Sequence, residues 1–183
     1  MRFQNKNGKL PKSKRIALDG ILTAVALIIF MVEQLIPLPF PVPGVKLGLS
    51  NVVTLFAVFA ISPIDGGIIL FVRIALGSLF AGQLSSFLYS LAGGVLCYGV
   101  TLLLYKIVTE KQIFVCGVFG AIMHNVGQIC VAILLTGTPG IVTYLPVLVG
   151  FGVATGLTTG LIAQLLVIKL KKHTHSENES GDQ

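Results

Sequence analysis

The sequence predicts an all-α, polytopic membrane protein, a bundle of about six transmembrane helices with the N- and C-termini in the cytoplasm. Apolar residues make up 54% of the 183 residues and charged residues only 11%, against about 25% charged in an average soluble domain. The apolar residues form several runs, the longest of which can cross a hydrocarbon layer of about 30 Å at 1.5 Å per residue. The basic residues collect on one predicted side of the membrane.

Three parts are expected along the chain. Residues 1–15 form a basic cytoplasmic segment, 16–170 the transmembrane domain, and 171–183 a polar cytoplasmic tail that we predict to be disordered. The first apolar run, 16–36, is longer than the core of a typical signal peptide and no small-residue cleavage site follows it. We therefore interpret it as a retained first helix.

The later helices are expected at 47–61, 63–80, 84–107, 110–136 and 140–170. The second is short for a span, so a five-helix or re-entrant arrangement stays open. Ser62 offers an N-cap, with Pro63 in the first turn. Thr109 and Gln112 have the spacing of a capping box, and Pro146 is expected to break or restart the last helix.

The basic residues predict the orientation. Eleven of the thirteen Lys and Arg fall in segments that are cytoplasmic if the N-terminus is inside: six lie before residue 16, and the others are Lys106, Lys111, Lys169, Lys171 and Lys172. This is a strong positive-inside bias. The net charge of +6 is therefore assigned to the membrane surface, and no pattern predicts nucleic-acid binding.

Polar residues inside the predicted spans concentrate in the outer half of the bilayer. Such groups are costly in lipid and usually face an interior cavity, so we predict a ligand pocket that opens outward. The candidate ligand-binding residues are Glu33, Lys46, Asn51, Arg73, Tyr89, His124, Asn125 and Gln128. The proline-rich segment 37–46 could lie over this pocket as a lid or serve only as a stiff connector.

Several of these residues also have a structural interpretation. His124 and Gln128 share a helix face and could simply hydrogen-bond to neighbouring helices. Arg73 needs an acceptor, which is either Glu33 in an ion pair or an anionic ligand. Tyr89 could be an interface aromatic residue, and Lys46 could only anchor the second helix.

Small residues indicate where helices approach closely. Gly152, Gly156 and Gly160 form two GxxxG steps, and Gly20 with Ala24 forms a small-xxx-small pair. The glycine steps serve either internal packing or the docking of a partner membrane protein.

Motifs of enzymes and metal sites are missing from the sequence. It has no P-loop, HExxH, GxSxG or aspartate-rich DDxxD motif, and Cys97, Cys116 and Cys130 form no CxxC. We predict no catalytic residue, no metal site and no intrinsic cofactor.

The chain resembles a family of small bacterial membrane proteins named heptaprenyl diphosphate synthase component I or Gx transporter. The resemblance rests on the stretch Lys46–Leu55 (KLGLSNVVTL), on Glu33 before Ile36-Pro37, on Ser90–Gly94 and on the stretch His124–Gln128 (HNVGQ). That family is similar in architecture to the substrate-binding S components of energy-coupling factor (ECF) transporters. The resemblance implies six helices, an outward pocket capped by the first outer loop, and a docking face for a coupling subunit near Ala17, Gly20 and Ala24.

Three functions follow as hypotheses, all for a multi-pass protein of the bacterial cytoplasmic membrane. The first is a substrate-binding subunit of a small-molecule transporter, with a vitamin, flavin, quinone or prenyl compound as ligand and membrane coupling subunits as partners. The second is an electron-transfer subunit for extracellular electron export that engages quinone, with bound quinone or flavin as the redox group. The third is a non-catalytic membrane component associated with heptaprenyl diphosphate synthase.

Overall fold

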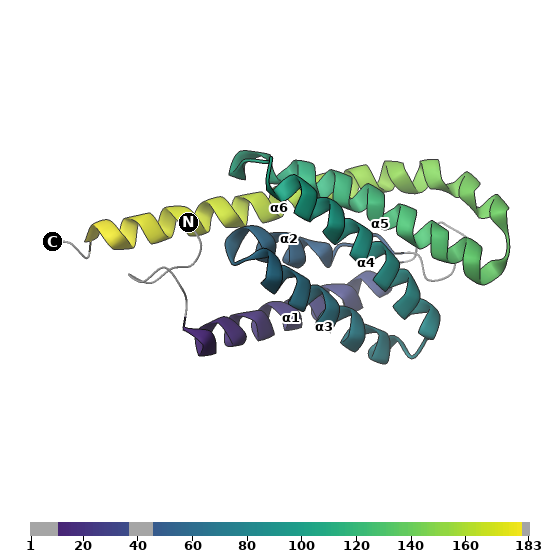
Figure 1. Ribbon diagram of the computed structural model, residues 1–183, viewed down its shortest axis with the longest axis horizontal. Helices are drawn as coiled ribbons and strands as arrows, with labels where there is room; N and C mark the ends of the chain where they lie inside the picture. Colours follow the sequence, from purple (N-terminus) through teal and green to yellow (C-terminus); the bar gives the residue numbers. More distant parts are fainter. Residues whose placement is uncertain (1–10, 37–45, 181–183) are drawn as a thin grey trace.

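The computed structural model describes residues 11–36 and 46–180, with the side chains of 173–180 left out. Its helices are α1 (Lys12–Gln34), α2 (Asn51–Ala60), α3 (Pro63–Ala81), α4 (Leu84–Tyr105), α5 (Ile113–Thr136) and α6 (Leu145–Ser180) (Figure 1). Two short 3-10 turns, Glu110–Gln112 and Pro139–Tyr144, precede α5 and α6. The described residues contain no strand, and the predicted polytopic helical bundle is confirmed.

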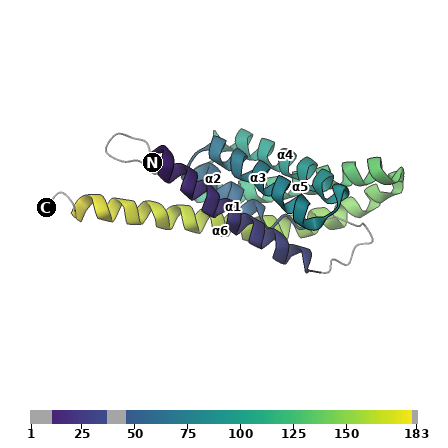
Figure 2. The ribbon, with the colours of Figure 1, turned by 90° about the horizontal axis from the view of Figure 1, so that it is seen from below.

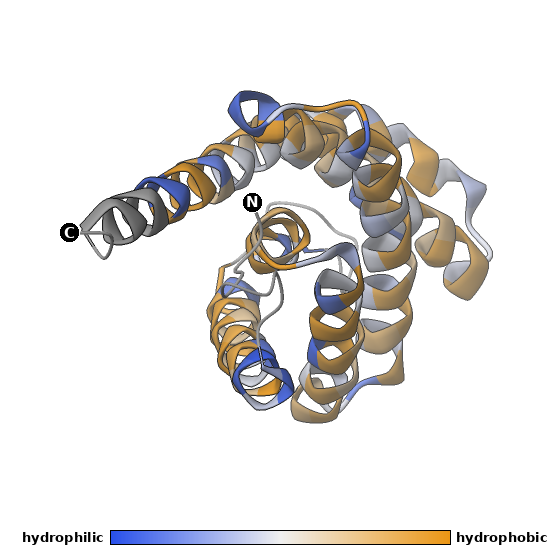
Figure 3. Ribbon diagram, turned by 60° about the vertical axis from the view of Figure 1, so that its left-hand side comes forward, coloured by the Kyte–Doolittle hydropathy of each residue, from blue (hydrophilic) through white to orange (hydrophobic). Residues whose placement is uncertain are grey.

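Five of these helices are long and apolar enough to cross a membrane, all of them except α2. The 10 residues of α2 extend only about 15 Å. Hydrophobic residues cover most of each helix, and hydrophilic colour gathers at helix ends (Figure 3). The described chain therefore consists of five spans and one short helix, which is the shorter second element that the sequence left open.

The short helix α2 lies inside the bundle. It contacts each of the other helices, α1, α3, α4, α5 and α6. Its buried side chains, among them Val53, Leu55 and Ala57, form one apolar core with Ile69 of α3 and Ala163 of α6. Because neighbouring helices surround α2, neither it nor the chain leading into it has to be stable against lipid on its own.

Two ion pairs tie helix ends together at one end of the bundle. Arg15 at the start of α1 pairs with Asp65 at the start of α3 at 2.7 Å, and Lys171 of α6 pairs with Glu110. The Ser62 hydroxyl accepts from the Asp65 backbone N–H, as the predicted N-cap requires. The start of α1 and the end of α6 thus lie at the same end of the bundle (Figure 1). That this end faces the cytoplasm stays a prediction.

The first and last helices, α1 and α6, are longer than their sequences predict. α1 begins at Lys12 rather than at residue 16, and α6 continues to Ser180, beyond the rest of the bundle (Figure 2). The predicted disordered tail over 171–183 is therefore helical through most of its length. Between Pro146 and Gly181 the sequence has no proline, and its charged residues are compatible with a helix. Pro146 lies in the first turn of α6, where proline is tolerated.

The glycine steps of α6 serve packing inside the bundle. A Cβ on Gly156 would lie 2.5 Å from the Gly117 carbonyl oxygen of α5, and one on Gly160 would lie 2.7 Å from the Phe114 Cα. Together with Gly152 they are buried, so this face is occupied within the chain and is not open to a partner. By contrast, the predicted docking residues Ala17, Gly20 and Ala24 are exposed on the surface of α1.

Candidate functional site

The residues before α2 form a non-helical segment inside the bundle, which we call the central strap (Lys46–Ser50). Gly48 of the strap lies against His124 of α5, which is twelve residues before the end of that helix at Thr136. Twelve residues correspond to about 18 Å along a helix, so the strap reaches the middle of the bundle. Irregular backbone at this depth in a membrane protein is tolerated where protein surrounds it or where it borders a cavity.

Hydrogen bonds fix the strap to three helices. The backbone N–H of Lys46 donates to Oε1 of Gln128 at 3.3 Å, and its ammonium donates to the Ser86 hydroxyl at 2.6 Å. The N–H of Gly48 donates to the Glu33 carboxylate at 2.5 Å. Side chains at the end of α1, the start of α4 and the C-terminal half of α5 therefore bind Lys46 and Gly48 of the strap.

His124 stands at the centre of a further set of contacts. Its Nδ1 lies 3.3 Å from the Asn51 side-chain nitrogen, and its Nε2 lies 3.1 Å from the Gln128 side-chain nitrogen. The Asn51 side-chain oxygen in turn accepts from the Arg73 guanidinium at 3.0 Å. The side chains of Arg73, His124 and Gln128 are at most 3% exposed, and that of Asn51 is half-buried. Helices α2, α3 and α5 thus meet in one buried polar network.

Phe30 of α1 holds the two cations of this region. The Lys46 ammonium lies 4.1 Å from the centre of its ring, and the Arg73 guanidinium lies 5.9 Å from it. Both distances allow attraction between a cation and the face of an aromatic ring.

Most of the candidate ligand-binding residues meet in one place, which we call the polar cluster. It comprises Glu33, Lys46, Asn51, Arg73, Ser86, His124 and Gln128. Two predicted residues lie elsewhere: Tyr89 packs in an apolar cluster with Ile129 and Leu148, and Asn125 donates to the Leu148 carbonyl of α6. Arg73 forms no ion pair with Glu33 within the described part of the chain, and its acceptor there is Asn51.

Phe30 and Ser86 also contact Lys46 in the polar cluster, but neither was predicted as a ligand-binding residue. Phe30 stands three residues before Glu33 in a helix, a spacing that puts both side chains on one face. That spacing could have identified it. Ser86 belongs to the polar group at the start of α4, but its partner Lys46 could not be identified from sequence because the contact is between residues 40 positions apart.

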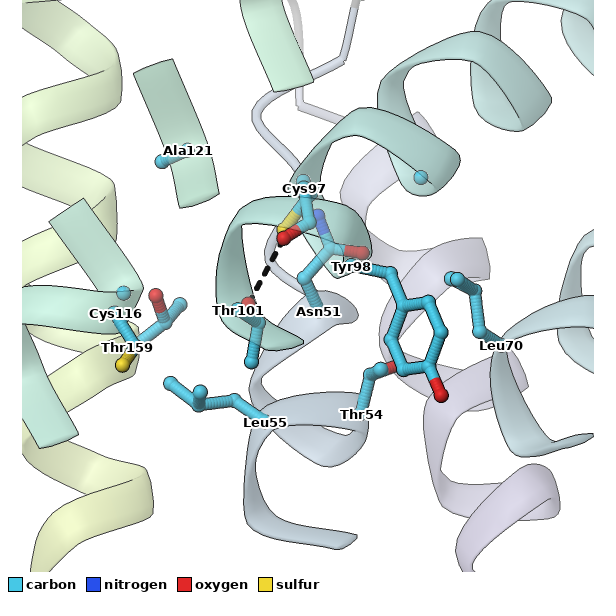
Figure 4. Close-up of a pocket in the computed structure, with 13 residues that line it drawn as sticks. Asn51, Thr54, Leu55, Leu70, Cys97, Tyr98, Thr101, Cys116, Ala121 and Thr159 are labelled. Carbon is cyan, nitrogen blue, oxygen red and sulfur yellow. Dashed lines mark hydrogen bonds between the residues drawn. The ribbon is translucent and has the colours of Figure 1, made fainter. Parts of the chain in front are cut away.

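A small cavity adjoins the polar cluster at Asn51 (Figure 4). It is lined by Gly48, Asn51, Thr54, Leu55, Leu70, Gly94, Cys97, Tyr98, Thr101, Cys116, Gly117, Ala121 and Thr159. The space open to the centre of a water molecule is about 20 Å³, enough for water but not for a larger solute. The strap therefore fills the region where an outward pocket was expected, and the predicted lid residues 37–45 lie outside the described residues.

Several buried polar atoms around the strap have no hydrogen-bond partner within the described residues, 11–36 and 46–180. They are Oε2 of Glu33, Nε of Arg73 and the hydroxyls of Ser50 and Thr54. Buried polar atoms are nearly always paired in proteins, so each exception needs an explanation. Six such atoms occur among the described residues: these four, and Oδ1 of Asp19 and of Asn125, which lie elsewhere. The grouping of four around one segment indicates a place where another polar molecule can bind.

Comparison with known proteins gives two matches. A family model described as heptaprenyl diphosphate synthase component I matches residues 22–166. A solved structure described as the S component of a bacterial ECF transporter aligns with a TM-score of 0.50 and 21% sequence identity, over 91% of this chain and 98% of that chain. At this identity the likeness shows a shared fold. No curated protein matches the chain.

Proposed function

The chain belongs to the family described as heptaprenyl diphosphate synthase component I, and from this membership and the fold that it shares with a transporter S component we propose that it is the substrate-binding membrane subunit of a small-molecule transporter. The observation that carries the proposal is the central strap, Lys46–Ser50. Irregular backbone and buried polar side chains are brought together at mid-bundle, where transporters commonly bind their substrates.

In this proposal the ligand enters from the outer side and replaces contacts that now close the polar cluster. Lys46, Asn51 and His124 provide groups that can exchange their internal hydrogen bonds for bonds to the ligand. The apolar Phe30 ring beside them offers a surface for the ligand's non-polar part. Movement of residues 37–45 over the site as a lid stays a prediction.

Energy for transport would come from partner subunits. The small residues Ala17, Gly20 and Ala24 are exposed on α1, and nothing in the described chain lies within 4 Å of where a Gly20 Cβ would stand. Small residues on a lipid-facing helix allow another helix to approach closely. This supports α1 as the surface that docks a membrane coupling subunit.

Mass spectrometry of the small molecules that copurify with the full chain in mild detergent tests the proposal. We expect a water-soluble compound in the wild type that falls at least tenfold in His124→Ala, because the imidazole links α5 to Asn51. The Ser78→Ala variant is the control, since Ser78 is half-buried away from the contacts of the polar cluster and its hydroxyl donates to the Ala75 carbonyl of its own helix. The control should keep the compound, and gel filtration should show all three proteins folded.

Two results would reject the ligand-binding role. One is a wild-type protein that carries no compound above the level seen with an unrelated membrane protein. The other is a folded His124→Ala variant that retains the compound in full. A Gln128→Ala variant, which removes the other contact of the imidazole, replaces His124→Ala if the latter fails to fold.

The family description favours a second candidate, a non-catalytic membrane component that works with a heptaprenyl diphosphate synthase. Mixing the purified chain with a synthase subunit and measuring prenyl diphosphate formation tests it, and an unchanged rate would exclude it. The hypothesis of a quinone-engaging electron-transfer subunit, with bound quinone or flavin, stays a prediction that rests on the family resemblance.

A further inference from the structure

The polar cluster holds more positive than negative charge. Lys46 and Arg73 are 9% and 2% exposed, and the one carboxylate among them, Glu33, is 4% exposed. No ion pair joins Glu33 to either cation in the described part of the chain. Residues 37–45, which lead into the strap, carry no ionisable side chain in their sequence. One buried positive charge is therefore left without a counter-charge, and such a charge is costly at membrane depth.

Neutral groups hold the two cations and leave donors unused. The guanidinium of Arg73 donates to Asn51, but its Nε–H has no acceptor in the part of the chain that the structure describes. The ammonium of Lys46 has three N–H donors, and Ser86 accepts from it. Phe30 contributes its ring face to both cations, which attracts charge but accepts no conventional hydrogen bond.

The amides around His124 increase the surplus of donors. Asn51 and Gln128 use their oxygens to accept from Arg73 and from the Lys46 backbone, so each turns its NH₂ group toward the imidazole. A neutral imidazole has one N–H and one acceptor nitrogen. It can therefore accept from only one of the two amides, and the other NH₂ group remains a donor without a good acceptor.

We infer that the ligand of this site is an organic anion whose carboxylate or phosphate group binds between Lys46 and Arg73. Such a group supplies the missing negative charge and several acceptor oxygens at once, and Arg recognises it through its planar fork of N–H donors. Oε2 of Glu33, an acceptor without a hydrogen-bond partner among the described residues, would take a hydroxyl or N–H from the same molecule. This inference rests on the proposed function, because it names the substrate class of that site.

Thermal unfolding of the purified full chain in detergent tests the inference with simple anions as probes. Sodium phosphate and sodium acetate are titrated against sodium chloride at equal ionic strength. Unfolding is followed by the reaction of the buried Cys116 thiol with a fluorogenic maleimide, in a Cys130→Ser background because the Cys130 thiol is exposed in the folded protein. We expect phosphate or acetate to raise the midpoint by a few degrees in a saturable manner. Which of the two acts distinguishes a phosphate-bearing from a carboxylate-bearing ligand.

Matched variants locate the effect. Arg73→Gln and Lys46→Gln each remove one cation from the cluster and should abolish the rise, whereas Lys111→Gln removes an exposed cation and should retain it. If Arg73→Gln fails to fold, Lys46→Gln carries the comparison alone. A midpoint that rises no more with phosphate or acetate than with chloride, or one that rises equally in the cluster variants, would overturn the inference.

The identity of the copurifying compound separates this inference from the proposed function. A neutral or purely cationic compound that is lost in His124→Ala would leave the transporter role standing and reject the anion. An anionic compound lost in the same variant would support both.

Discussion

At the residue scale, Gly48 determines how closely the strap approaches α5. Its φ is +76°, and a Cβ there would lie 2.9 Å from the Asn51 side-chain nitrogen and 3.1 Å from Cδ2 of His124. Glycine adopts this left-handed conformation without steric cost. Gly48 can therefore lie in contact with the His124 imidazole while its own backbone N–H donates to Glu33.

We predict that Gly48→Ala destabilises the protein by more than the left-handed conformation alone accounts for. That conformation costs a non-glycine residue about 1–2 kcal/mol. Gly82 provides the control, because its φ is +63° but nothing lies within 4 Å of a Cβ placed on it. Thermal unfolding in detergent should show a larger loss for Gly48→Ala than for Gly82→Ala, and only the former should lose the copurifying compound. Equal losses would mean that the strap does not depend on close contact with His124.

At the scale of elements, the bundle combines one tightly packed helix pair with one enclosed short helix. The carbonyl oxygens of Gly117 and Gly156 each lie within 2.5 Å of the position of a Cβ on the other glycine, so the backbones of α5 and α6 touch. Helix packing in lipid depends on such close approach. This contact holds α5 in place, and α5 carries His124 and Gln128 into the polar cluster.

We predict that Gly156→Ala separates α5 from α6 at a cost of about 1–3 kcal/mol, the usual range for overpacking a close contact. The matched variant is Gly150→Ala in the same helix, where a Cβ would meet nothing within 4 Å. Since alanine favours a helix by up to about 1 kcal/mol over glycine, Gly150→Ala should be neutral or stabilising. Thermal unfolding of both variants in detergent measures the difference. A Gly156→Ala variant as stable as Gly150→Ala would show that α5 and α6 can separate without cost.

At the scale of the whole molecule, the two ends of the bundle are built differently. One end is tied by the ion pairs Arg15–Asp65 and Lys171–Glu110. Toward the other end, the strap and the polar cluster lie between α1, α4 and α5, and the residues that join α1 to the strap are uncharged. This asymmetry is the one that a subunit needs if it is to take up a solute from one side while partners bind elsewhere.

Part of this arrangement could be predicted from sequence and part could not. Hydropathy and helix-start signals such as Ser62 locate the spans well, because they depend on neighbouring residues. The concentration of polar residues in one half of the bundle was also predictable, and Glu33, Arg73 and His124 belong to the same polar cluster through the strap and Asn51. The contacts of Lys46 with Ser86 and of Arg73 with Asn51 depend on how helices far apart in sequence pack, which no local pattern encodes.

The glycines of α6 illustrate the same limit. Their spacing indicates close helix contact but does not say with which helix, so Gly152, Gly156 and Gly160 could have faced a partner. In the structure α5 occupies that face. The start of α2 likewise differs from the expected residue 47: Gly48, with a φ of +76°, and the polar contacts of Lys46 and Gly48 keep the strap irregular, and α2 begins at Asn51.

The most direct test of the central claim, that the polar cluster is the ligand site, is an experimental structure of the full chain purified with the molecule that it retains. We predict density for that molecule between the Lys46 ammonium and the Arg73 guanidinium. We also predict that the strap is shifted away from His124 to admit the molecule. Density confined to the lipid-facing surface or to the end of the bundle near Arg15 and Asp65, with the polar cluster still closed on itself, would contradict the claim.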